Sequence, residues 1–222
     1  MKKLIFSFLW VVIVQIANAE CTKPILVSGS LSKDSQTDTV SISSKQDCQN
    51  HPGTVYSTIA VSLNENSKKH SFLSKEFSYP NNYEIDASIK NGSIFIYESS
   101  GEGYRPVSLS SVYQFKFTKN KIRLIGFTET TFSTISKATK EEATPDEKDE
   151  NLIDRSKVVN YNLLTGEYKI TKKGYDFSRP EKTKITTGNG GSFEVYLENV
   201  DFFAHKDIFS SHIPSALLSD NK

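Results

Sequence analysis

The feature that most constrains this chain is an alternation of apolar and polar residues that starts near Ile25 and recurs almost to the end. A period of two residues is that of a β-strand with one buried face. The segment Thr54 to Leu63 is the clearest example, since its apolar face is interrupted only at Ser57. Beyond Ala19 no stretch shows a long apolar rhythm of 3.6 residues, so helices are not expected to form the core.

Turn residues divide the predicted strands into hairpins. Asn91-Gly92 is a strong two-residue hairpin signal, because both central positions of a type I′ turn need a positive φ. Lys119-Asn120-Lys121 joins an aromatic strand over 112–118 to a strand over 122–127. Gly126 inside the second strand predicts a bulge or a close backbone approach.

The same reasoning extends to the rest of the chain. Further strands are predicted over 83–89, 93–97, 158–164, 168–171, 184–187 and 192–197, the last two flanking a turn at 188–191, and 130–135 is predicted to extend the strand over 122–127. The segment 207–218 can form one short helix with Phe209, Ile213 and Leu217 inward. Many short strands with tight turns predict a mainly β protein of antiparallel sheets, arranged as a sandwich, a bent sheet or a partial barrel.

The first nineteen residues have the three zones of a secretory signal peptide. Met1-Lys2-Lys3 is positive, Leu4 to Ile16 is almost entirely apolar, and Ala17-Asn18-Ala19 places small residues where a signal peptidase cuts. The apolar run is shorter than the roughly 20 residues that span a bilayer. We therefore expect cleavage after Ala19 and a periplasmic or secreted protein. A short membrane anchor and a lipid-modified Cys21 are the alternatives, although Glu20 disfavours the lipid.

Length and charge limit the classes of function. Residues 20–222 are enough for a single β-rich domain. The whole chain has 27 basic and 26 acidic residues, and loss of Lys2 and Lys3 leaves 25 basic residues and a net charge of about −1. This near-neutral charge argues against a nucleic-acid-binding protein, which would carry a basic surplus.

Cys21 and Cys48 are the two cysteines of the chain. In an oxidising compartment an even number of cysteines predicts a disulfide. Closing a loop of about 28 residues would stabilise the fold by roughly 3–4 kcal/mol in the chain-entropy model. The spacing is unlike that of a redox-active Cys-x-x-Cys pair, so a structural disulfide is predicted.

No catalytic, metal or cofactor site is predicted. His51, His70, His205 and His212 lack zinc-binding spacings, and the Gly-x-Ser-x-Gly elbow of serine hydrolases is absent. A glycosidase would need two acids across a cleft. The spacing in sequence leaves that undecided for the candidates Glu98, Glu102, Glu129, Glu194 and Asp201. Alternating aromatic residues favour core packing, with an exposed tyrosine-rich binding face as the alternative.

The segment 137–154 interrupts the strand pattern. It is mostly charged or small, contains Pro145 and has no apolar periodicity, so a flexible loop is expected, with a short solvated helix as the alternative. We interpret this charged loop as a contact surface for a partner. Its acidic candidates are Glu141, Glu142, Asp146, Glu147, Asp149 and Glu150.

Three sequence blocks resemble a pattern found in uncharacterised exported bacterial β-rich proteins. The blocks are the aromatic strand 113–117, the strand 122–127 with its Leu-Ile-Gly, and the segment 160–166 with its Asn-x-Leu-Thr-Gly hairpin. The long charged insertion between the second and third blocks departs from that pattern. The resemblance implies an exported β-structured module and carries no activity or site residue.

These inferences favour a non-enzymatic, exported protein-binding module, such as an inhibitor or an immunity protein acting in the periplasm. Export, near-neutral charge, a disulfide-linked β scaffold and loops able to carry specificity support it. One alternative is an envelope hydrolase whose site is assembled from distant residues. The other is a structural envelope component that associates through exposed strand edges.

Overall fold

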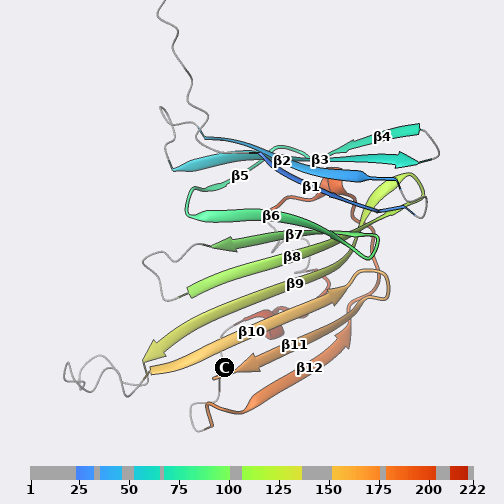
Figure 1. Ribbon diagram of the computed structural model, residues 1–222. Coiled ribbons are helices and arrows are strands. Elements are labelled where there is room, and N and C mark those ends of the chain that lie inside the picture. The colour runs from blue at the N-terminus through green and yellow to red at the C-terminus, as the bar shows by residue number, and fades with distance from the viewer. Residues whose placement is uncertain are drawn as a thin grey trace, which may run out of the picture.

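The structure is a computed structural model of the chain, and it describes residues 24–32, 36–46, 53–65, 68–100, 107–136, 152–175, 179–203 and 211–219. Within these residues the chain forms two antiparallel sheets (Figure 1). The five-stranded sheet contains β1 (Ile25–Gly29), β2 (Asp38–Gln46), β3 (Thr54–Glu65), β4 (Lys68–Leu73) and β5 (Phe77–Pro80). The seven-stranded sheet contains β6 (Tyr83–Lys90), β7 (Ser93–Ser100), β8 (Val107–Thr118), β9 (Lys121–Ser136), β10 (Leu152–Asn162), β11 (Glu167–Lys173) and β12 (Thr183–Asn189).

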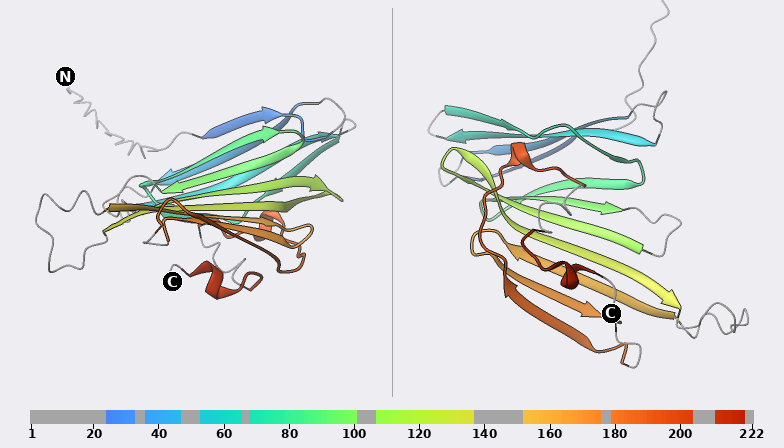
Figure 2. Two further views of the ribbon diagram at one scale, coloured as in Figure 1. Left: turned by 90° about the horizontal axis from the view of Figure 1, so that it is seen from below. Right: turned by 180° about the vertical axis from the view of Figure 1, so that it is seen from behind.

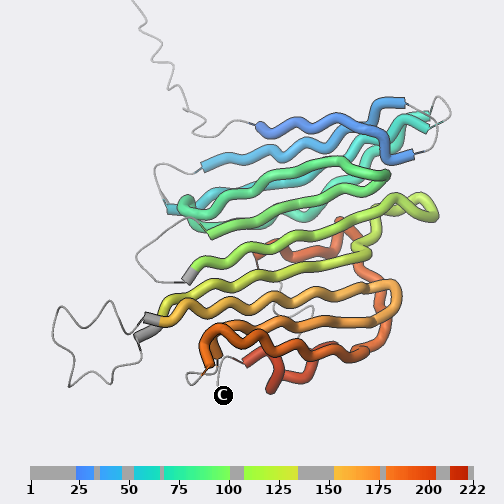
Figure 3. Tube along the Cα trace, turned by 60° about the horizontal axis from the view of Figure 1, so that its bottom comes forward, coloured from blue at the N-terminus to red at the C-terminus, as the bar shows by residue number. Residues whose placement is uncertain are grey.

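The seven-stranded sheet is a meander in which every strand pairs with the next one in sequence. Figure 3 traces this open order from β6 down to β12. In the five-stranded sheet β4 and β5 both pair with β3, and β6 of the other sheet packs against β1 and β2. The architecture is therefore the predicted one: antiparallel sheets that enclose a core and do not close into a barrel.

The hairpins predicted at Asn91-Gly92 and at Lys119-Asn120-Lys121 both form. Asn91 and Gly92 have φ values of 52° and 68°, and Lys119 and Asn120 have values of 49° and 59°. Gln114 pairs with Gly126, whereas Phe115 pairs with Leu124. The residue between them on β9 therefore has no partner on β8, and the predicted bulge lies directly before Gly126.

A single apolar cluster fills the space between the sheets. It includes Ile59 of β3 and Tyr113 of β8, which are fully buried. Phe202 joins the two halves, because its ring centroid lies 4.9 Å from that of Phe77 on β5 and 5.0 Å from that of Tyr113. Ser57 does not break the buried face of β3: its hydroxyl is buried and lies 2.6 Å from the Ser44 hydroxyl.

The chain after β12 leaves the sheet and runs behind it (Figure 2). We call residues 191–203 and 211–219 the C-terminal segment; it contains the short helices η1 (Leu197–Asn199) and α2 (Ser215–Leu218). The strand predicted over 192–197 is therefore wrong. Its backbone instead bonds β9 and the β10–β11 turn. It lies on the side of β9 where β10 ends, so that the first residues of β9 pair with β8 but not with β10.

Two other boundaries also differ from the prediction. β10 begins at Leu152, so the charged loop is shorter than 137–154 at its C-terminal side. Of the helix predicted over 207–218, the structure describes 211–218, and within that part Ser215–Leu218 is helical while the buried Ile213 precedes the helix. Pro214 directly before this turn restricts the residue ahead of it to extended backbone. Phe209, the signal peptide, both cysteines and the six acidic candidates lie outside the described residues.

Asp38 at the start of β2 holds three chain segments together. Its buried carboxylate accepts hydrogen bonds from the backbone N–H groups of Leu31 (2.7 Å), Ser32 (3.4 Å) and Asn64 (2.8 Å). Asp38→Ala leaves these donors unpaired and should lower the free energy of unfolding by about 2–4 kcal/mol. Urea denaturation measures this. Asp86→Ala, at an exposed site on β6, is the control; equal costs for the two variants would contradict the prediction.

Candidate functional site

The two faces of the seven-stranded sheet have different surroundings. Tyr113, Leu124 and Ile170 point to the face that carries the core and the C-terminal segment. The opposite face, here called the outer face, receives the alternate residues. One row across it, fixed by the strand register, consists of Val112, Thr128, Asn160, Lys169 and Thr187. Because strand residues alternate between faces, these side chains point away from the core.

A trough of about 740 Å³ lies on the outer face across β8 to β12. Gly126 contributes to its depth, since it has no side chain, whereas its cross-strand partner Gln114 and the next residue of β9 on this face, Thr128, both have one. A Cβ at Gly126 would lie 3.2 Å from the Gln114 Oε1. Cavities of this volume fall within the range of protein ligand sites.

The polar side chains of the trough are held by neighbours. Thr128 donates a hydrogen bond from Oγ1 to the Asn160 Oδ1 at 2.9 Å. The Asn162 Oδ1 accepts the backbone N–H groups of Leu164 (2.9 Å) and Thr165 (3.2 Å), which fixes the β10–β11 turn. Among the described residues that line the trough, only Glu167 and Lys169 are charged. The trough is thus a preorganised surface that is poor in charge.

Large apolar side chains are exposed on the same face. Phe132 on β9 is 42% exposed, Leu164 at the β10–β11 turn is 49% exposed, and Ile185 on β12 is 57% exposed. The register places Phe132 and Ile185 on the outer face, beyond the rows that line the trough. Apolar residues of this size are normally buried, so their grouping around a cavity on one face indicates a contact surface.

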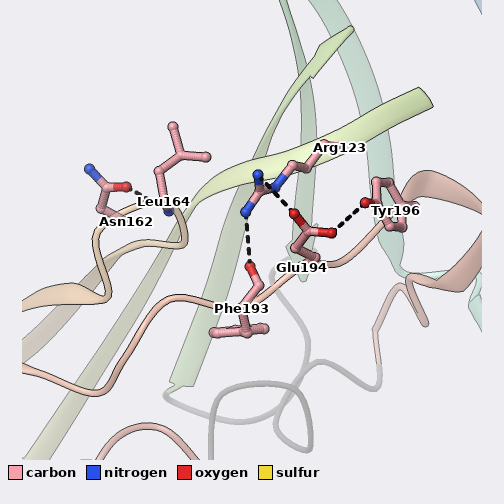
Figure 4. A network of polar contacts seen from close by, with 6 residues as sticks. All are labelled: Arg123, Asn162, Leu164, Phe193, Glu194 and Tyr196. Carbon is pink, nitrogen blue, oxygen red and sulfur yellow. Dashed lines mark hydrogen bonds and ion pairs between the residues drawn. The ribbon is translucent and has the colours of Figure 1, made fainter. Parts of the chain in front are cut away.

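The C-terminal segment lies on the other face of the seven-stranded sheet, here called the covered face, and its backbone is attached beside β9. The N–H of Leu124 donates to the Val195 carbonyl at 2.8 Å, and the N–H of Phe193 donates to the Leu163 carbonyl at 3.3 Å. Side chains repeat this attachment (Figure 4). Arg123 contacts Glu194 through Nη1 and Oε1 at 3.3 Å, and Tyr196 donates from Oη to the Glu194 Oε2 at 2.6 Å. The segment 193–196 therefore fills the open side of β9.

The far end of the C-terminal segment is attached through aromatic and amine groups. The His212 ring stacks on Phe193 with centroids 3.9 Å apart and an angle of 2° between the planes. Lys157 and Lys172 donate from Nζ to the carbonyls of Leu218 and Ser219, both at 2.9 Å. Carbonyls at the end of the segment thus pair with amines of the sheet, which keeps this face covered.

Two ionisable groups are shifted by these contacts. The hydrogen bond from Tyr196, and then the charge of Arg123, lower the pKa of Glu194 from its ordinary value of 4.5. Burial, and then the charge of Glu98, raise the pKa of Tyr113 well above its ordinary range. Neither group lies in the trough.

Glu98 has a buried carboxylate on the covered face of the seven-stranded sheet. It accepts hydrogen bonds from the Tyr113 hydroxyl and from the backbone N–H of Phe203, both at 3.1 Å. Glu98 and Glu129 both pair in register with Ser111, so two of the sequence candidates for acid chemistry are brought to one face. The adjoining cavity is only about 50 Å³. Because Glu98 bonds the C-terminal segment, its evident role is to anchor that segment.

The other sequence candidates are separated. Glu194 belongs to the Arg123 network, Asp201 is exposed beside Phe202, and Glu102 and His205 lie outside the described residues. The described residues contain no cluster of three side chains suited to a metal ion. Nor do they include a helix of the length and apolar character needed to cross a membrane.

The trough residues were missed by motif reasoning because they carry no catalytic pattern. A signal was nevertheless present, since the three blocks of the resemblance meet there. Gln114 comes from the first block, Gly126 from the second, and Asn160, Asn162 and Leu164 from the third. No family model, curated protein or solved structure matches this chain.

The Glu194 contacts predict a pH-dependent attachment of the C-terminal segment. A carboxyl whose pKa is lowered by folding stabilises the fold above its ordinary pKa and loses this effect as the pH falls through the lowered value. Hydrogen exchange of the Leu124 amide, which bonds Val195, should therefore accelerate below about pH 4.5 relative to the intrinsic rate. NMR measures this rate.

Glu194→Gln is the matched variant, because it removes the charge and keeps the shape. It should speed hydrogen exchange of the Leu124 amide at pH 7. It should also abolish the part of the pH dependence of that exchange that comes from the Glu194 carboxyl. The Ser74 amide, which bonds Ile59 in the other sheet, serves as the internal reference. If the Leu124 amide exchanged at the same rate in the wild type and in Glu194→Gln at pH 7, Glu194 would not contribute to the attachment of the segment.

Proposed function

We propose that this protein is an exported, non-enzymatic protein-binding module that holds its partner on the outer face of the seven-stranded sheet. The observation that carries the proposal is the difference between the two faces. The C-terminal segment covers one, whereas no described segment covers the other, which is hollowed where the three sequence blocks meet. A sheet that needed only to be stable would not require exposed Phe132, Leu164 and Ile185 on the bare face.

The composition of the outer face favours a protein partner. Charged residues are depleted at the centre of protein interfaces, while aromatic and apolar anchors are enriched. Charged residues make up 24% of the chain, yet Glu167 and Lys169 alone represent them among the described residues of the trough. Amide and hydroxyl groups such as those of Asn160 and Thr128 add directional hydrogen bonding to such a surface.

The compartment belongs to the same proposal. The predicted signal peptide and the predicted Cys21–Cys48 disulfide support an extracytoplasmic protein, and an inhibitor or an immunity protein is the role that fits a scaffold built for binding. The hydrolase alternative finds less support in the geometry. Glu98 and Glu129 lie on the covered face, and Glu98 is already engaged by Tyr113 and Phe203.

The test compares two matched leucines in purified protein used as bait for envelope extract. Leu164→Asp alters the trough, whereas Leu73→Asp alters a leucine on β4 that is 60% exposed, on the other sheet. Affinity for the captured protein should fall at least about tenfold in Leu164→Asp, because anchors near the centre of an interface dominate binding. Leu73→Asp should bind like the wild type, and both variants should keep the wild-type melting temperature.

Binding that is equally strong in both variants would exclude the trough as the contact surface. The charged loop provides the competing site on the same protein, since it connects the paired ends Ser136 and Leu152. Deleting 140–151 should abolish capture if the acidic residues hold the partner, with the melting temperature nearly unchanged. Loss in Leu164→Asp together with retention in the deletion variant assigns the contact to the sheet.

A further inference from the structure

β12 is the outermost strand of the seven-stranded sheet. It pairs with β11 along Thr183–Asn189 with an uninterrupted register, and no described segment pairs with its other side. Figures 1 and 2 show it at the end of the sheet, away from the five-stranded sheet. The opposite end is different, because β6 packs against β1 and β2.

The hydrogen bonds beside β12 show which of its backbone groups face outward. The Gly190 N–H donates to the Gly166 carbonyl at 2.9 Å, which continues the β11–β12 register by one residue. Backbone groups alternate sides along an antiparallel strand. The groups of Lys184, Thr186 and Gly188 therefore face β11, and those of Thr183, Ile185, Thr187 and Asn189 face the free edge.

This edge lacks the usual protection against pairing. Natural sheets guard free edges with prolines, bulges, very short strands or several charges. β12 has seven residues, no proline and a regular register, and Lys184 is its one charged residue. Ile185 adds an apolar side chain that is 57% exposed beside the outward-facing backbone.

We propose that β12 pairs antiparallel with β12 of a second copy of this chain. The backbone groups that face the free edge belong to odd-numbered residues. They can therefore bond one another only in registers that place odd-numbered residues of the two copies opposite each other. The register centred on Thr186 does this and is the same for both copies. It places Ile185 opposite Thr187 of the second copy. Lys184 then lies opposite Gly188 of the second copy. Gly188 has no side chain, and the Tyr168 ring of the same copy packs against its backbone. No like charges face each other.

The pairing has a consequence for the outer face. Antiparallel edge strands related by a two-fold axis form one continuous sheet, with the axis perpendicular to it, so both outer faces point the same way. Thr187, Gly188 and Asn189 border the trough. The two troughs therefore lie on the same side of the dimer, one on each side of the β12–β12 interface. A partner with two matching surfaces would gain avidity.

Disulfide trapping tests the register. In the proposed pair, Thr186 and Thr186 of the second copy form a non-hydrogen-bonded pair with Cα atoms about 4.5 Å apart. This is within the range of a disulfide. Thr186→Cys should form covalent dimers on mild oxidation at least about tenfold faster than Lys184→Cys, whose two copies would lie roughly 13 Å apart along the strands. Equal rates for the two variants would overturn the register.

Sedimentation of protein purified from the periplasm of an expression host tests the association itself. An interface made of one pair of strands is small, so we expect a weak dimer. The weight-average mass should keep rising with protein concentration up to roughly hundreds of micromolar. Thr187→Pro removes one outward N–H and leaves the β11 ladder intact, so it should stay monomeric; Thr187→Val should dimerise like the wild type. A wild type that stays monomeric would overturn the proposal and leave the trough and its partner untouched.

Discussion

The packing of Phe202 between the two sheets is the contact on which the rest of the arrangement depends. Its ring touches Phe77 of one sheet and Tyr113 of the other, so the C-terminal segment becomes part of the core. Leu197, Val200 and Ile213 are buried with it, each contributing roughly 1.5–3 kcal/mol. The Arg123–Glu194 ion pair stabilises the attachment less than this burial does, because its carboxylate is exposed to solvent. Apolar burial therefore sets where the segment lies, and the polar contacts set its register.

Covering one face of a sheet determines what the other face can do. The C-terminal segment buries the apolar surface of the covered face, and the hydrogen bond from the Phe203 N–H to Glu98 ties the segment to that face. The outer face keeps an array of threonine and amide side chains with exposed apolar residues around it. The bulge before Gly126 deepens this face locally, so one insertion in β9 and one missing side chain help to create the trough.

The hairpins were predictable because their signals are local. Asn91-Gly92 and Lys119-Asn120 adopt positive φ at adjacent positions, and the alternation in β3 continues through Ser57 because its buried hydroxyl is hydrogen-bonded to the Ser44 hydroxyl. The error at 192–197 has a non-local cause. Those residues alternate like a strand, and they do pair with a strand, but their partner is the distant β9 and not the neighbouring β12.

The sequence by itself determined the mainly β character, the turns at 91–92 and 119–120, the bulge beside Gly126 and the alternating burial of the predicted strands, because side-chain periodicity and glycine chemistry act over a few residues. No bounds were predicted for β1, β2, β4 and β5. The trough was decided only in three dimensions. Gln114, Gly126 and Asn160 meet there because two successive strand pairings, β8 with β9 and β9 with β10, bring residues that are distant in sequence side by side. Which face stays bare was likewise a tertiary matter, since only burial of Phe202 among residues of both sheets places the C-terminal segment on the other side.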